Sequence, residues 1–390
     1  MRAVDSSGHF DLAVVGAGIV GLATALAAAR RGLRVAVIDR DARANGASVR
    51  NFGFVCVTGQ ERGETWLRAR RSREVWREVA GAAGIGVLHD GMWMVVRRPE
   101  ARAVIEEFLR GDMTQGCRLL EPAEARRRFP QLAARGLAAV LESTTELRVD
   151  SRTAIPLLAQ WLASAHRVHF LRSTVVTGVE PPWLATSAGR LRAGRVVVCP
   201  GDDYTGLYAD RLARQALTRC TLQMLRLADP GFRIPAALMS DLGLARYAGY
   251  AQLAASAALR RRLAAEQPQH LEHGVHLIVV QNADGSLVVG DSHHYSMTPE
   301  PFARADIDAL ILGEFRAAFG IDPPAVLERW IGSYAAAADR TVLIDAPEPA
   351  VRIAIVTSGT GASTAFAIGE ELVASLFDSG TMPAPTAPLV

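Results

Sequence analysis

A glycine-rich turn near the N-terminus has the spacing of a dinucleotide-binding motif. Gly16, Gly18 and Gly21 form a GxGxxG pattern that follows the apolar run 12–15 and opens an alanine-rich stretch. In such a motif the first glycine makes the tight turn, the second lets the backbone approach a pyrophosphate, and the third lets helix and strand pack closely. The helix N-terminus then faces the phosphate charge. The pattern predicts a bound dinucleotide, with a purely structural glycine turn as the alternative.

A carboxylate follows at the distance that this motif requires. Asp39 lies 18 positions after Gly21, at the end of the apolar run 33–38. A carboxylate in that place accepts hydrogen bonds from the ribose hydroxyls of adenosine. Asp39 and its neighbour Arg40 are therefore candidate cofactor contacts.

Two further elements favour a flavin over a nicotinamide cofactor. Residues 46–53 form a second Gly/Ser/Asn-rich segment, and residues 357–363 form a third, more than 300 positions later. A nicotinamide enzyme of ordinary size does not need them, whereas backbone amides at the C-terminal segment suit the electron-rich edge of a flavin ring. The sequence therefore predicts FAD rather than NAD.

The surrounding elements predict an α/β fold with two domains. A strand, a helix over 21–31 and a strand over 33–38 form a βαβ unit, and strand–loop–helix texture returns at 350–377. Between them, further helices are expected at 63–83, 100–109 and 157–164, and residues 218–290 alternate short strands with turns. We expect a Rossmann-like FAD-binding domain, of the glutathione-reductase type, that carries an inserted, mainly antiparallel β-sheet substrate domain with helices. The FAD-binding domain is assigned to 9–85, 149–215 and 326–378, the substrate or cap domain to 86–148 and 216–325, and a flexible tail to 379–390.

The composition restricts the available chemistry and partners. All 43 basic residues are arginine, so no lysine can form a Schiff base or act as a general base, and any cation facing a substrate is a guanidinium. The net charge of +3 gives no reason to expect a nucleic acid partner. Four cysteines without a CxxC pair fit a reduced cytoplasm. The apolar stretch 10–29 contains Asp11 and spaced glycines, so we expect no membrane span, and residues 1–9 lack the order of a signal peptide.

Together these motifs resemble the D-amino acid oxidase superfamily, which includes glycine oxidase, sarcosine oxidase and D-amino acid dehydrogenases. The resemblance covers nearly the whole chain and rests on the N-terminal fingerprint, on 48–53, on Val196-Val-Val-Cys-Pro-Gly201, and on 359–361 with Gly369-Glu-Glu-Leu-Val373. It implies backbone at Val176 beside the adenine and the 359–363 loop at the pyrimidine edge of the flavin. The cofactor contacts expected are Gly16, Gly18, Ile19, Val20, Gly21, Asp39, Arg40, Ser48, Asn51, Phe52, Gly53, Val176, Gly201, Gly359, Thr360, Gly361, Ala362 and Ser363.

A narrower resemblance concerns the substrate. The segments 50–53, 222–226, 290–293 and 357–363 are similar to a subgroup associated with aminophosphonate breakdown, whose enzymes remove N-alkyl groups from 2-aminoethylphosphonate. Relatives that act on α-amino acids often carry a carboxylate-binding arginine where this chain has Tyr334. Sarcosine oxidases with covalent flavin use a late cysteine and a lysine near the flavin, but this chain has no cysteine after Cys220 and no lysine. The resemblance therefore implies noncovalent FAD.

The expected reaction is oxidation of the carbon next to an amine nitrogen, with dioxygen as acceptor and peroxide as product. We expect the cofactor to perform the chemical step, so no catalytic acid–base pair is required. Arg50 is the first candidate for an anionic phosphonate or carboxylate group of the substrate, although a surface or phosphate-positioning arginine is the alternative. The other candidate substrate contacts are Tyr247, Tyr250, His293, Tyr334 and Thr360. Cap packing or a strand-end turn is the alternative for Tyr247, Tyr250 and His293, and Thr360 could contact either the substrate or the flavin.

Other functions remain open at the level of sequence. The paired residues His293 and His294 lack a third ligand at metal-binding spacing, so no metal is expected. The rival enzymes are a glycine/sarcosine-type or D-amino acid oxidase, and a dehydrogenase that passes electrons to a quinone or a carrier. A flavin-binding protein without turnover is the alternative from another class.

Overall fold

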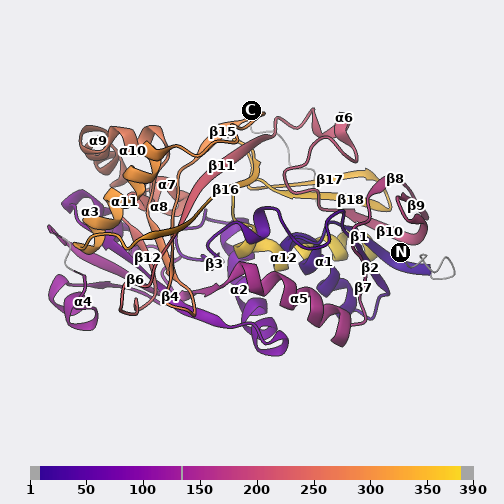
Figure 1. The fold of residues 1–390 in the computed structure, drawn as a ribbon, viewed down its shortest axis with the longest axis horizontal. Coiled ribbons are helices and arrows are strands. Elements are labelled where there is room, and N and C mark those ends of the chain that lie inside the picture. Colours follow the sequence, from indigo (N-terminus) through magenta and orange to yellow (C-terminus); the bar gives the residue numbers. More distant parts are fainter. Residues whose placement is uncertain (1–8, 133–134, 379–390) are drawn as a thin grey trace.

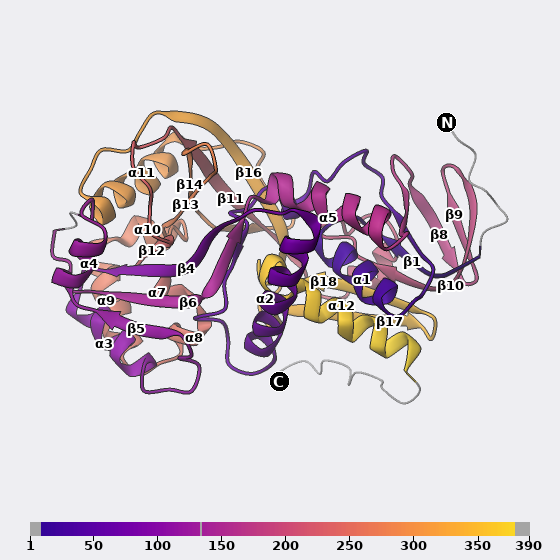
Figure 2. The same cartoon turned by 90° about the horizontal axis from the view of Figure 1, so that it is seen from below.

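Two β-sheets form two neighbouring lobes, which Figures 1 and 2 show in views 90° apart. The structure is a computed structural model, and it describes residues 9–132 and 135–378. The tail expected at 379–390 lies outside the described residues. Within the described ranges, no helix has both the length and the apolar composition that crossing a membrane requires.

The first sheet is built around parallel strands in the order β7-β2-β1-β10-β18. Strand β17 joins its edge antiparallel to β18, and the β8–β9 hairpin joins through β10. The strands are β1 (His9–Val15), β2 (Val35–Ile38), β7 (His169–Leu171), β8 (Val176–Glu180), β9 (Trp183–Thr186), β10 (Gly189–Val198), β17 (Val342–Glu348) and β18 (Val351–Val356).

Both faces of this sheet are buried, which explains why its strands are continuously apolar in sequence. Leu12 and Val14 of β1 pack against the helical layer, whereas Ala13, between them, faces the opposite core. The helical layer consists of α1 (Ile19–Arg30), α2 (Glu64–Ala83), α5 (Ser151–Ala165) and α12 (Gly361–Phe377). The opposite face is covered by the β8–β9 hairpin and by the segment around the short helix α6 (Ala209–Leu212).

Helix α5 is longer than the sequence pattern predicts. It begins at Ser151 rather than near 157, because the Asp150 side chain accepts a hydrogen bond from the N–H of Arg152 (3.1 Å) and caps the helix. Pro156 suggests a helix start, but it lies inside the helix. The helix therefore contains one residue, Pro156, that cannot donate the usual backbone hydrogen bond.

The second sheet is antiparallel except where β4 pairs with β12. Its strands are β3 (Phe54–Val55), β4 (Val87–Val96), β5 (Cys117–Leu120), β6 (Ala139–Val149), β11 (Thr218–Leu227), β12 (Ala237–Ser240), β13 (Ile278–Gln281), β14 (Leu287–Gly290), β15 (His294–Ser296) and β16 (Val326–Ala336). Its helices are α3 (Pro99–Phe108), α4 (Pro122–Arg128), α7 (Gly243–Arg246), α8 (Ala248–Ala251), α9 (Ser256–Glu266), α10 (Pro268–Glu272) and α11 (Ala305–Phe319), and a 3₁₀ turn lies at Ala47–Val49. This mainly antiparallel sheet with helices matches the expected cap.

Strands β3 and β16 belong to the second sheet, although their residues are assigned to the FAD-binding domain from the sequence. Strand β16 pairs along β11 from Thr218↔Ala336 to Leu227↔Val326, and β3 pairs with β6. The domain boundary assigned at 325/326 is therefore too early, because β16, which follows it, still belongs to the cap sheet. Strand β16 carries the chain from the cap sheet back toward β17 of the first sheet (Figure 1).

The parallel strands bring the predicted motifs to one edge. Strands β1, β10 and β18 are mutually parallel neighbours, so their carboxyl ends meet at the same edge of the sheet. The GxGxxG turn follows β1, Gly201 follows β10, and the 357–363 loop follows β18. In open α/β sheets this edge is where ligands bind.

The contact between α1 and α12 gives a test of the packing that shapes this edge. A Cβ atom on Gly369 of α12 would lie 2.7 Å from backbone atoms of Ala23 and Thr24 in α1. We expect Gly369→Ala to lower the free energy of unfolding by about 1–3 kcal/mol through overpacking. Gly313→Ala in α11 is the control, because a Cβ atom there would meet no other atom within 4 Å; it should change stability by at most about 1 kcal/mol, toward greater stability. Chemical denaturation measures both, and equal stability of the two variants would contradict the close packing.

Candidate active site

The turn between β1 and α1 presents a helix N-terminus whose N-cap residue has no capping side chain. A Cβ atom on Gly21 would lie 1.9 Å from the carbonyl oxygen of Gly16, so the turn closes only with glycine at that position. No acidic residue occupies the first turn of α1, and its N-cap, Gly18, makes no side-chain hydrogen bond. The N–H of Ile19 donates to Ser48 Oγ (2.9 Å). The positive end of the helix is therefore available to a phosphate.

Asp39 is oriented by backbone donors at the end of β2. Its carboxylate accepts hydrogen bonds from the N–H groups of Ala17 (2.6 Å) and Asp41 (2.8 Å). The side chain is partly exposed, so free lone pairs on its oxygens remain for ribose hydroxyls. Its neighbour Arg40 is exposed and forms an ion pair with Asp203.

The segment after Gly46 is tied to both sheets. Asn51 Nδ2 donates to the carbonyl of Ala47 (2.6 Å), and its Oδ1 accepts the N–H of Gly53 (2.6 Å). The carbonyl of Arg50 accepts a hydrogen bond from Trp330 Nε1 of β16 (3.1 Å). These bonds fix the backbone of the segment. Several of its residues also line the cavity described below.

The N-terminus of α12 is a second uncapped helix end at the same edge. Its first turn contains no acidic residue, and its N-cap, Thr360, makes no capping hydrogen bond. Ser363 Oγ accepts the N–H of Cys56 (2.9 Å), which anchors this helix end to the segment before α2. Gly359 has φ +73°, and a Cβ there would lie 3.0 Å from Tyr334 Cζ, so the loop passes directly beside the tyrosine ring. Backbone N–H groups at this end suit an electron-rich ring edge.

A cavity of about 470 Å³ joins these elements to the cap. On the side of the first sheet it is lined by both helix ends; on the side of the cap it is lined by residues of β11, α7, β13 and β16 and the segments beside them. The predicted cofactor contacts along it are Gly18, Ile19, Val20, Gly21, Ser48, Asn51, Phe52, Gly201, Gly359, Thr360, Gly361, Ala362 and Ser363. Two helix N-termini without acids and an adjacent carboxylate match the pyrophosphate, ring edge and ribose of FAD.

The remaining predicted cofactor residues lie outside the cavity lining. Gly16, Asp39, Arg40, Gly53 and Val176 do not line it. Val176 is buried in the core between the sheet and the β8–β9 hairpin, and the N–H of nearby Thr174 donates to the carbonyl of Asp39 (2.9 Å). Its backbone thus lies near the carboxylate expected to bind ribose, but its side chain is a core residue.

Most predicted substrate residues line the cavity, but Tyr250 does not. Arg50, Tyr247, His293, Tyr334 and Thr360 are part of its wall.

The Tyr250 ring is instead buried, packs on Phe108 at a ring-centroid distance of 4.9 Å, and fills the space beside Gly59. The short helix α8 turns this side chain into the core of the cap, so the prediction for Tyr250 is wrong.

Three residues that the sequence did not mark as site residues complete the wall. Arg246, at the end of α7, is exposed to the cavity, and its Nη2 donates to Tyr295 Oη (3.1 Å). His276 and Asp291 also line the cavity. No spacing signal marks Arg246 among 43 arginines. Asp291 lies two positions before His293, but only the pairing of the segments beside β13 and β14 brings His276 to it.

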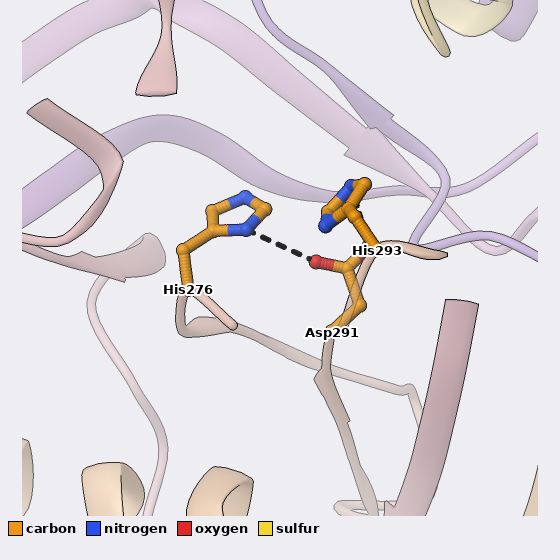
Figure 3. A group of neighbouring side chains, drawn as sticks. All are labelled: His276, Asp291 and His293. Carbon is orange, nitrogen blue, oxygen red and sulfur yellow. Dashed lines mark ion pairs between the residues drawn. The ribbon is translucent and has the colours of Figure 1, made fainter. Parts of the chain in front are cut away.

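His293 and His294, which are adjacent in the sequence, do not act as a pair in the structure, because each contacts different residues. His294 lies outside the cavity lining, and its Nε2 contacts His273 Nδ1 (3.1 Å). His293 is grouped instead with His276 and Asp291, and the three potential ligand atoms lie within 4.8 Å of one another (Figure 3). Adjacent strand residues point to opposite sides of the strand, which separates His293 from His294.

Burial governs the protonation of this group. Burial, with the positive charge of Arg246, holds the pKa of His276 and of His293 well below the usual range. Burial raises the pKa of Asp291 to about 7, although Arg246 opposes the shift. At neutral pH both imidazoles are therefore uncharged. The same guanidinium charge opposes the binding of a divalent cation by these three side chains.

Known proteins share both the family pattern and the fold. The family model described as FAD dependent oxidoreductase (DAO) matches residues 11–375. A search of curated proteins found no match. The chain is similar in structure to glycine oxidase from Geobacillus kaustophilus, with TM-score 0.72, 16% identity and 96% of each chain covered.

Two other solved structures share this fold. Dithionite-reduced L-alpha-glycerophosphate oxidase from Mycoplasma pneumoniae, with FAD bound, has TM-score 0.71 and 16% identity, with 95% of each chain covered. Iminodiacetate oxidase from Chelativorans sp. BNC1 has TM-score 0.69 and 16% identity, with 94% of this chain and 95% of that chain covered. The family model spans nearly the whole chain, and the site geometry suits its cofactor. The chain therefore belongs to the DAO family, and it is an FAD-dependent oxidoreductase.

Proposed function

We propose that the protein oxidises a C–N bond of a small N-alkylated aminophosphonate, such as N-methyl-2-aminoethylphosphonate. The observation that carries this proposal is a group of three donors at one end of the cavity. Arg246, Tyr295 and Tyr334 line both the main cavity and an adjoining outer cavity of about 290 Å³. They therefore stand where the two cavities meet, in the position to hold the anionic end of a substrate.

The chemistry of these donors suits a phosphonate. Arg246 supplies a permanent positive charge and a planar set of N–H donors. Burial raises the pKa of Tyr334 well above its usual value, so its hydroxyl keeps its proton and can donate. With the Tyr295 hydroxyl, the group offers a cation and two hydroxyl groups to the three oxygens of a phosphonate. A carboxylate has two oxygens and makes less use of such a set.

The reaction follows from this placement. Bound FAD supplies the hydride acceptor for oxidation of the carbon next to the amine nitrogen. The protein binds the anion at the outer end and leaves the amine toward the inner part of the cavity. Water hydrolyses the resulting imine to an aldehyde and the primary amine. With dioxygen as electron acceptor, hydrogen peroxide is the third product.

A glycine/sarcosine-type or D-amino acid oxidase is the second candidate. Arg246 can also bind a carboxylate, and two of the similar structures are named for carboxylated amines, glycine and iminodiacetate. Tyr334, where relatives acting on α-amino acids often carry arginine, favours the phosphonate.

Peroxide release across a substrate panel separates these candidates. We expect N-methyl-2-aminoethylphosphonate to give a higher kcat/KM than sarcosine, glycine or D-alanine, because the phosphonate engages all three donors. Activity confined to the amino acids would end the phosphonate proposal. Anaerobic bleaching of the flavin without reoxidation in air would identify a dehydrogenase instead of an oxidase.

Arginine variants test which guanidinium holds the anion. Arg50 also lines the cavity, but its Nη2 donates to Asn45 Oδ1 (3.2 Å) at the exposed rim. We expect Arg246→Gln to lower kcat/KM by about 10- to 100-fold, mainly through KM, since a charge-assisted hydrogen bond is lost. Arg50→Gln should have a smaller effect, and Arg304→Gln, an exposed residue paired with Asp306, is the control. A larger effect for Arg50 would assign the anion to that residue instead.

The attachment of FAD is a separate prediction. Cys56 and Cys199 are the cysteines that line the described cavity. Burial raises the pKa of both thiols, to about 12 for Cys199, so neither is a thiolate at neutral pH. We expect noncovalent FAD, which acid precipitation should release completely into the supernatant. A yellow pellet after precipitation would show a covalent bond.

A further inference from the structure

The group formed by His276, Asp291 and His293 is not used by the function proposed above. Asp291 lies between the two imidazoles, with Oδ1 3.3 Å from His276 Nδ1 and Oδ2 3.8 Å from His293 Nε2 (Figure 3). All three side chains are at least nine-tenths buried, yet all three line the cavity. They form a polar wall that is closed to bulk solvent and open to the ligand.

The backbone holds this group rigidly. The N–H of Asp291 donates to the carbonyl of His276 (2.9 Å), and the N–H of His276 donates to the carbonyl of Asp291 (3.2 Å). This pair lies just beyond the last pair of the β13–β14 ladder, Ile278↔Gly290, with the register shifted by one residue at Leu277. His293 is fixed separately, because its Nδ1 contacts the carbonyl oxygen of Gly274 (2.9 Å). That carbonyl can only accept, so Nδ1 carries the proton and Nε2 is an acceptor.

Several buried polar atoms of the group lack a partner. Asp291 Oδ1 and both ring nitrogens of His276 make no hydrogen bond with the described residues. Buried polar groups in proteins are almost always paired, so their partner comes from the cavity. Asp291 Oδ1 is an acceptor, as is one nitrogen of a neutral imidazole, and an ammonium group provides the matching N–H donors.

The group of His276, Asp291 and His293 lies further into the cavity than Arg246, so the two together offer partners for both charges of a zwitterion. Arg246 stands where the two cavities meet, while His276, Asp291 and His293 line the inner cavity and not the outer one. A small amine whose anion is held at Arg246 would direct its nitrogen inward, toward Asp291.

Resting on the proposed function, we propose that Asp291, flanked by His276 and His293, binds the substrate ammonium and accepts its proton. An amine of this kind has a pKa near that of lysine, about 10.4, so it arrives protonated at neutral pH. In the step, an N–H bond of the ammonium breaks, its electron pair stays on nitrogen, and an O–H bond forms on Asp291. The freed lone pair is what allows hydride to leave the neighbouring carbon.

The charged and titratable groups around Asp291 favour this role. They are Arg246 and Tyr247 beside α7, Cys220 of β11, and the two histidines. Burial holds the thiol and the Tyr247 phenol in their neutral forms at pH 7, because it raises the pKa of each. Arg246 is the permanent charge that keeps an ionised Asp291 accessible despite its burial.

Flavin reduction across pH gives the kinetic test. Holoenzyme is reduced anaerobically with N-methyl-2-aminoethylphosphonate from pH 6 to 10. Wild type should lose rate below about pH 7, where Asp291 is protonated and cannot accept, and stay level from 7 to 10. Asp291→Asn should be slower at pH 7 by on the order of 10²–10⁴-fold. Its rate should rise about tenfold per pH unit toward the amine pKa, because only free amine reacts.

The control for Asp291→Asn is a histidine variant outside the cavity. His294→Gln changes a histidine that lies next to the group in sequence but outside the cavity lining, so it should keep the wild-type profile. A constant deficit of Asp291→Asn at all pH values would indicate a structural role and overturn the proposal. A wild-type rate that follows amine ionisation alone would overturn it without any variant.

Thermal unfolding of the holoenzyme provides a readout that needs no substrate. Burial raises the pKa of Asp291 from 3.8 to about 7, so the folded protein keeps a proton there that the unfolded chain has released. Wild-type stability therefore falls as pH rises from about 4 to about 7 and is unaffected by this group above 7. The Tm of Asp291→Asn minus the Tm of wild type should therefore increase from pH 5 to 7, because only the wild type loses stability, and should stay constant from pH 7 to 9.

The two readouts separate the two proposals. If none of the amines reduces the flavin of wild type at any pH, the proposed function fails, while the Tm difference still reports the protonation of Asp291. A Tm difference that does not change with pH would overturn the proton-accepting role of Asp291, whatever the substrate.

Discussion

The close approach of α1 and α12 is the contact on which the rest of the site depends. Gly369 packs against the backbone of α1, and Gly21 packs against the turn that precedes the same helix. These contacts bring two helix N-termini, neither with an acid in its first turn, to the edge of one parallel sheet. Positive helix ends without acidic partners are matched by an anionic, electron-rich ligand. Segments far apart in the sequence, at α1 and α12, therefore meet at the edge where the FAD-binding motifs lie.

The cap sheet forms the wall of the cavity opposite the cofactor motifs. Strand β16 pairs along the length of β11, and the chain after it returns to β17 of the first sheet, so this strand is one of the links between the two sheets. It carries Tyr334 to the loop at Gly359, where cofactor and substrate residues meet. Trp330 of the same strand bonds the backbone of Arg50. The position of the substrate wall relative to the cofactor is therefore set by β-sheet register rather than by loops.

Charge is distributed along the cavity in a way that suits a zwitterion. A guanidinium and two tyrosines stand where the inner and outer cavities meet, and an acid between two neutral imidazoles lies further in. Burial acts on both ends: it keeps Tyr334 protonated and raises the pKa of Asp291 to about 7. In the proposed function, the same low-polarity environment supplies a neutral donor, Tyr334, for the anion and a proton acceptor near neutrality for the amine.

The sequence by itself determined the cofactor, because the fingerprint glycines, Asp39 and the 357–363 loop are each local motifs whose steric reasons can be stated for one short segment. It also determined the inserted antiparallel cap, since turn-rich alternation differs from the continuous apolar runs of a parallel sheet. Only the tertiary structure decided the substrate wall. His276 and Asp291 meet through strand pairing across 15 positions, Arg246 is one guanidinium among many until α7 directs it into the cavity, and Tyr250 is turned into the core by a single short helix. Such placements depend on register and on the packing of distant segments, which no local pattern of residues specifies.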